Sequence, residues 1–245
     1  MEKSMKKQSV SRTVRFWGGY VEKIFLMVLV IGAVYVLFLP VLINEDMKGT
    51  ELFLLRASYA VMMEGIIIFV LPFSYPTYNL PLALSFGSGR REAVAGMQLS
   101  NLLAVGQNLL IVGIVELAAG KMAAVSGREF FAYAGTGFAA AAGILLAIAA
   151  IGQFGAALIL KFGAKGTAIY IIVFALAVFA GALTVGFSVG TGQIDDAEIL
   201  SMLLDAHVLQ MIKRIVGVLL TVDVAAYIVG YLVLKRTVMR YEVRM

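Results

Sequence analysis

Long apolar segments separated by short polar links make up most of this chain. Six of them reach the roughly 17 to 25 residues that a helix needs to cross the hydrocarbon core of a bilayer. They lie at about 24–43, 57–78, 97–118, 131–160, 167–189 and 215–234. The pattern therefore predicts an all-α integral membrane protein with six transmembrane helices in one domain, residues 24–245.

The segment before the first span, residues 1–23, has an amphipathic pattern. Val10, Val14, Trp17 and Val21 recur at helical spacing, and basic and polar residues lie between them. This spacing predicts an N-terminal amphipathic helix in the cytoplasmic membrane surface, with a frayed basic tail as the alternative.

A second amphipathic segment, residues 191–214, lies before the last span. It is too polar to cross the membrane, but Glu198, Ser201 and Asp205 form a narrow polar stripe at helical spacing. We expect an extracytoplasmic helical insert between helices 5 and 6.

Proline and small residues predict how two of the spans end and pack. Three prolines should stop the second helix near the cytoplasmic face, namely Pro72, Pro76 and Pro81. The fourth span is too long for a hydrocarbon core of about 30 Å, so it must tilt, project from the membrane, or break near Gly152 and Gly155. Small residues recur every four positions along it, which suits either general packing or a dimer seam: Gly135, Ala139, Gly143 and Ala147.

Composition and charge support the membrane assignment and predict an orientation. The chain is 61% hydrophobic and 14% charged, against about 25% charged in soluble domains. Of the 20 lysines and arginines, all but six fall on the side of the termini in a six-span topology. The six are Lys48, Arg56, Lys121, Arg128, Lys213 and Arg214. Both termini are therefore expected in the cytoplasm, and the net charge of +5 reflects topology, with no nucleic-acid partner.

Catalytic and cofactor motifs give little support for an enzyme. The "GFSVG" stretch at 186–190 matches a serine-hydrolase pattern, but that chemistry needs a strand-to-helix turn, and His207 is the only histidine. "GAKGT" at 163–167 lacks the spacing of a phosphate-binding loop. A group of three acidic residues could begin a helix or hold a divalent cation: Asp195, Asp196 and Glu198. We take the helix start, and expect no catalytic, metal or cofactor site in this chain.

Three carboxylates fall within the predicted spans. Glu64 and Asp223 are about 10 and 13 Å from the outer ends, whereas Glu116 lies near the surface. A carboxylate deep in hydrocarbon must face protein or water. We expect Glu64 and Asp223 to line a translocation pathway, with helix packing through Tyr59, Asn108 or Tyr227 as the alternative.

The polar link between the second and third spans, "LSFGSGRREAVAGMQ" at 84–98, carries a family resemblance. This link, the six spans, the amphipathic N-terminus and the late insert resemble the membrane (permease) subunits of type-2 ATP-binding-cassette exporters. In that family the corresponding segment is a coupling helix that docks on a separate ATPase.

The resemblance implies partners, a location and a docking surface. It implies a separate ATP-binding-cassette ATPase that binds Mg-ATP, a second membrane subunit (identical or related), surrounding lipids and the cytoplasmic (inner) membrane of a bacterium. Residues 80–92 would couple to the ATPase, and the docking surface would comprise Leu82, Ser85, Phe86, Gly87, Ser88, Arg90, Arg91 and Glu92.

The residues of this link also favour docking over simple membrane anchoring. Anchoring explains Arg90 and Arg91, but not Phe86 among polar neighbours, nor Gly87 and Gly89, which predict a shaped turn leading into a short helix. The alternative function is a stand-alone secondary carrier, or a membrane substrate-capture subunit without ATPase docking. A membrane-embedded enzyme or sensor is a further alternative.

Overall fold

The structure is a computed structural model that describes residues 49–75, 79–85, 87–172 and 206–240, with a few single positions elsewhere. Those positions are Arg15, Gly19, Glu22, Lys23, Leu26, Met27, Val30, Ile31, Val34 and Ala175. Every regular element in the described part of the chain is a helix, and none is a strand. The all-helical prediction is therefore confirmed.

Five helices account for most of the described residues. They are α2 (Thr50–Ser74), α3 (Leu80–Ser85), α4 (Arg90–Met122), α5 (Gly127–Phe162) and α8 (Ala206–Arg240). Within the described ranges, three stretches are long and apolar enough to cross a membrane: Arg90–Met122, Gly127–Phe162 and His207–Arg240. These findings support a membrane protein with at least three membrane-crossing helices.

The observed helices contain several predicted spans and extend beyond them. α4, α5 and α8 enclose the predicted spans 97–118, 131–160 and 215–234, and α2 begins at Thr50, seven residues before its predicted span. Described positions within 24–43 and 167–189 are helical. Most of those two segments, the amphipathic N-terminus and residues 191–205 lie outside the described residues, so the six-span topology stays a prediction.

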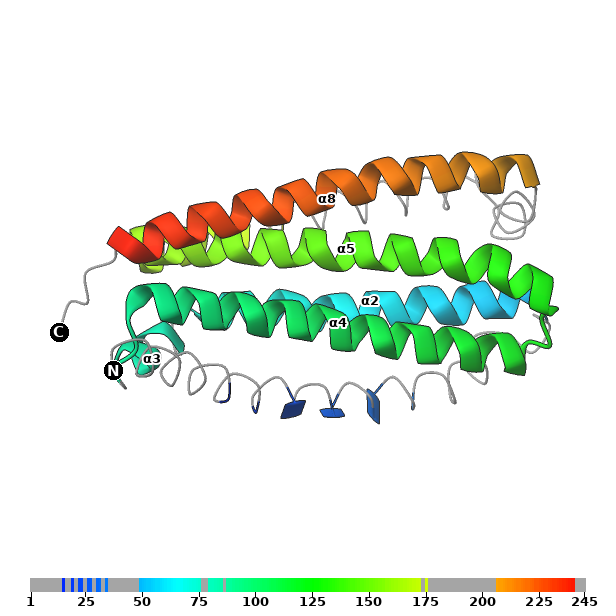
Figure 1. Ribbon diagram of the computed structural model, residues 1–245, viewed down its shortest axis with the longest axis horizontal. Coiled ribbons are helices and arrows are strands. Elements are labelled where there is room, and N and C mark those ends of the chain that lie inside the picture. The colour runs from blue at the N-terminus through cyan, green and yellow to red at the C-terminus, as the bar shows by residue number, and fades with distance from the viewer. Residues whose placement is uncertain are drawn as a thin grey trace, which may run out of the picture.

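The long helices lie side by side in an elongated bundle (Figure 1). α2, α5 and α8 run in one direction and α4 runs in the other (Figure 1). One end contains α3, the start of α4 and the ends of α5 and α8, and we call it the α3 end. The opposite end contains the short link from α4 to α5, and we call it the loop end.

Helix ends follow local sequence signals. α2 ends at Ser74, two residues after Pro72, as the prolines predict. α5 begins with a capping box in which the Ser126 hydroxyl accepts the Glu129 N–H at 3.3 Å. The helix is continuous through Gly152 and Gly155, so the alternative of a break is wrong. At about 1.5 Å per residue α5 is roughly 54 Å long, and it must tilt or project from the membrane.

The small residues of α5 pack against α8. A Cβ atom placed on Gly143 would lie 2.9 Å from Asp223 Oδ2 and 3.7 Å from the Leu220 Cα. On α8, a Cβ on Gly230 would lie 3.3 Å from the Ala150 carbonyl oxygen. Close approach of these two backbones therefore requires glycine at both positions, which is packing within one chain.

Candidate functional site

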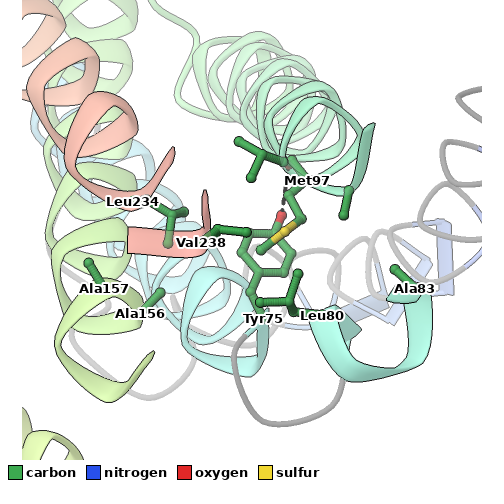
Figure 2. Close-up of a cluster of buried hydrophobic side chains, with 10 residues drawn as sticks. Tyr75, Leu80, Ala83, Met97, Ala156, Ala157, Leu234 and Val238 are labelled. Atoms are coloured by element: carbon green, nitrogen blue, oxygen red, sulfur yellow. Dashed lines mark hydrogen bonds between the residues drawn. The ribbon is translucent and has the colours of Figure 1, made fainter. Parts of the chain in front are cut away.

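The predicted docking segment begins with α3, a short helix fixed to the α3 end by its apolar side. Leu80 is fully buried and Ala83 is 5% exposed, in a cluster with Tyr75 and Met97 (Figure 2). Leu82 and Ser85 are exposed. Pro81 lies in the first turn, where its missing N–H leaves no helical hydrogen bond unmade. α3 therefore presents Leu82 and Ser85 outwards from a buried base.

A glycine in the left-handed backbone conformation ends α3. Gly87 has a φ of +78°, its N–H donates to the Leu84 carbonyl at 3.0 Å, and the Ser88 N–H donates to the Ala83 carbonyl at 3.1 Å. This pair of bonds is the Schellman motif, in which the left-handed position favours glycine. The predicted order, a turn followed by a short helix, is wrong: the short helix comes first, and the turn leads into the long helix α4.

The start of α4 uses two of the predicted docking residues for internal contacts. The Glu92 carboxylate accepts the Gly89 N–H at 3.1 Å, which caps the helix. Arg90 Nη1 donates to the Met239 carbonyl at 3.1 Å, in the last turn of α8. A cation at a helix C-terminus is favoured by the unpaired carbonyls and the helix dipole. Arg90 thus ties α4 to α8.

The remaining docking residues divide by exposure. Leu82, Ser85, Gly87 and Arg91 are exposed, whereas Ser88, Arg90 and Glu92 are half-buried. Phe86 lies outside the described residues, and its role stays a prediction. The accessible part of the predicted surface is therefore the outward face of α3, its closing turn and Arg91.

A second group of functional candidates lies inside the bundle, where packing sets the register of α2 against α4. Phe53 packs with Ala119 near the loop end, and the Tyr75 hydroxyl donates to the Met97 carbonyl at 3.1 Å near the α3 end. Glu64 lies about 11 residues, or three helical turns, from both Phe53 and Tyr75. It therefore shares their helix face, from which we infer that Glu64 points toward α4.

From the same spacing we infer that Asn108 lies opposite Glu64. Asn108 lies about three turns from both Ala119 and Met97 on α4. Glu64 is 1% exposed and Asn108 is 4% exposed. One oxygen of each has no hydrogen-bond partner: Glu64 Oε2 and Asn108 Oδ1.

A second polar layer lies nearer the loop end. Arg56, three residues after Phe53, and Glu116, three residues before Ala119, are both buried. A Cβ on Gly137 of α5 would lie 2.8 Å from Glu116 Oε1, so the carboxylate occupies the space beside that glycine. α4 continues for six residues beyond Glu116, to Met122, and the side chain is covered by α5. The depth of Glu116 in the membrane stays a prediction.

A third polar layer joins three helices toward the α3 end. Gln98 Oε1 on α4 accepts Gln153 Nε2 of α5 at 3.1 Å and the Tyr227 hydroxyl of α8 at 2.9 Å. Gln98, Gln153 and Tyr227 are all buried. Sequence reasoning named Tyr227 only as a partner for a carboxylate and missed both glutamines. Their polar character within apolar spans was the available signal.

Glu64 and Asp223 belong to different helix contacts. Glu64 is buried on α2, on the face that we infer lies toward α4, whereas Asp223 of α8 is half-buried against Gly143 of α5. Gly65, next to Glu64, packs on Ile148 of α5, so the two carboxylates lie at levels about 7.5 Å apart along α5. Of their proposed packing partners, Tyr227 donates to Gln98, and Asn108 Nδ2 donates to the Ala104 carbonyl. A pathway role for the two carboxylates stays a prediction.

The remaining chemical candidates are few. Within the described ranges, no group of three or more His, Cys, Asp or Glu side chains could hold a metal ion. His207 lies exposed at the start of α8. The "GFSVG" stretch and the acidic group at 195–198 lie outside the described residues. The functional groups that the described helices offer are therefore buried hydrogen-bonding side chains and buried ionisable side chains.

Comparisons with known proteins add no assignment. No protein-family model, curated protein or solved structure matches this chain. Any function therefore has to be argued from the two groups of residues above.

Proposed function

We propose that this chain is the permease subunit of an ATP-binding-cassette transporter of the type-2 exporter class. It would move substrate across the cytoplasmic membrane while a separate subunit hydrolyses Mg-ATP. The observation that supports this best is the construction of α3. Its base is buried through Leu80, and its outward face presents Leu82 and Ser85 beside the exposed Arg91 at one end of the bundle.

Contacts around α3 would pass a displacement to the transmembrane helices. Leu80 belongs to one apolar cluster with Met97 of α4, Ala156 of α5 and Leu234 of α8 (Figure 2). The Arg90 bond to Met239 links α4 and α8 at the same end. Tightly packed side chains deform little. A partner that moves α3 would therefore also move or break contacts of three long helices, as ATP-driven coupling requires.

The proposal includes the orientation and the assembly. The α3 end would face the cytoplasm, with both chain termini on that side and the insert before α8 outside. Basic residues gather at this end: Arg90, Arg91, Lys161, Lys235, Arg236 and Arg240. A second membrane subunit, identical or related, would complete the pathway. Exposed apolar residues along α8, such as Val218 and Leu232, suit contact with lipid or with that subunit.

Transport in proteoliposomes containing the chain and its ATPase tests this function. We expect uptake or release of substrate to require ATP and the partner, and to fall in Leu82→Asp and Arg91→Glu. Arg128→Glu is the matched control, because Arg128 is also an exposed arginine but lies at the loop end. Ion-driven transport by the chain alone would contradict the proposal and identify the carrier.

A further inference from the structure

The Glu64–Asn108 layer contains two buried acceptor oxygens, and no described side chain donates to either of them. Asn108 Nδ2 donates to the Ala104 carbonyl at 2.7 Å, which fixes the orientation of the amide. Its Oδ1 therefore faces away from that carbonyl and has no partner, and Glu64 Oε2 has none either. Two acceptor oxygens that lie opposite each other need a donor or a cation between them, and a proton on Glu64 or a bound cation would supply it.

The described residues one helical turn to either side of this layer supply no compensating charge. One turn toward the loop end, Ala60 and Val112 are buried, and one turn toward the α3 end, Ile68 and Val105 are buried. Leu145 of α5 is fully buried in the same apolar cluster as Ile68. An ionised carboxylate is strongly disfavoured in such an environment unless it is paired.

The charged and titratable groups of the described helices that pack around this layer lie in other layers. Arg56 on α2 and Glu116 on α4 are about two helical turns, or roughly 12 Å, toward the loop end. Asp223 of α8 reaches α5 at Gly143, and the Tyr227 hydroxyl is bonded to Gln98. None of these groups belongs to the Glu64 layer.

We infer that Glu64 Oε2 and Asn108 Oδ1 form a binding site for one monovalent cation between α2 and α4. The shared chemistry is positive charge between a carboxylate and an amide oxygen. The cation is either a proton, which Glu64 carries and donates to Asn108, or Na⁺, which binds oxygen ligands. The inference rests on the packed core alone and does not depend on ATP-driven transport.

Unfolding of the purified full-length chain in detergent micelles tests the site, with Glu64→Gln as the main variant. The amide N–H of the variant donates permanently to Asn108 Oδ1, so no cation is needed. If the folded state binds one proton more than the unfolded state, the wild-type folding constant falls about tenfold per pH unit as pH rises. If Na⁺ is the ligand, a Na⁺ concentration of about ten times its Kd should raise the folding constant roughly tenfold at fixed pH. N-methylglucamine is the control cation.

Comparison of the variants decides whether the site exists and which cation it binds. A pH dependence whose slope falls by about one proton in Glu64→Gln identifies the proton. A dependence on Na⁺ that disappears in Glu64→Gln and persists in Glu116→Gln identifies Na⁺. The inference would be overturned if the folding constants of wild type and Glu64→Gln changed equally with pH and equally with Na⁺. If Glu64→Gln does not fold, Asn108→Leu replaces it, because loss of one acceptor should weaken the same dependence. An unchanged dependence in Asn108→Leu would also overturn the inference.

Discussion

Replacement of Gln98 by methionine should weaken the contact of three helices at one point. Gln98 Oε1 is the acceptor for Gln153 of α5 and Tyr227 of α8. Methionine has a similar length and is apolar, so it fills the space but leaves both donors without their partner. The change therefore removes two interhelical hydrogen bonds and little packing.

The expected cost follows from hydrogen bonds measured between membrane helices. Each contributes about 0.6 kcal/mol on average and up to about 1.7 kcal/mol. Loss of two bonds should lower the free energy of unfolding by about 1–3 kcal/mol. Tyr227→Phe and Gln153→Met should each cost about half as much. In Gln98→Met, a further Tyr227→Phe change should cost almost nothing, because its bond is already lost.

Reversible unfolding in mixed detergent micelles measures these differences. Gln107→Met is the matched control, since Gln107 is also on α4 and its Oε1 has no hydrogen-bond partner. The control should lose little stability. An equal loss for Gln98→Met and Gln107→Met, or full additivity of Gln98→Met with Tyr227→Phe, would refute the three-helix bond.

Three further predictions address packing, topology and transport. Gly143→Leu should destabilise the α5–α8 contact by about 1–3 kcal/mol through overpacking. Gly135→Leu should change stability little, because nothing lies within 4 Å of a Cβ there, and thermal unfolding of the two variants measures the difference. The chain has no cysteine, so Ser85→Cys and Ser126→Cys should react with a membrane-impermeant thiol reagent from opposite sides, and same-side labelling would contradict the orientation. Asp223→Leu should reduce transport more than it reduces folded protein; a proportional fall would make Asp223 structural.

The helical class and much of the helix register could be predicted from hydrophobic periodicity. The start of α2 was missed because Thr50 to Arg56 contains polar residues. Those residues stay helical because Phe53 packs on Ala119 and buries that turn. Length alone could not exclude a break in α5, since only packing shows that Gly155 is needed beside Tyr170, whose ring would lie 2.5 Å from a Cβ there.

The candidate site was predictable in outline and not in detail. Two arginines beside glycines marked the segment at the α3 end, and Leu82 and Arg91 are exposed as docking would require. The bond from Arg90 to Met239 joins residues far apart in the chain, so no local pattern could reveal it. The inferred pairing of Glu64 with Asn108 likewise depends on the register between α2 and α4, which tertiary contacts determine.

Site-specific photo-crosslinking from Ser85 tests the central claim, that the outward face of α3 binds an ATPase. A photoreactive residue at Ser85, in the membrane-embedded full-length chain, should crosslink to a protein that contains a phosphate-binding loop. The complex isolated with it should hydrolyse ATP. The same residue at Ser126, exposed at the loop end, should give no such product. Equal crosslinking from both positions, or a Ser85 product without a nucleotide-binding subunit, would contradict the account.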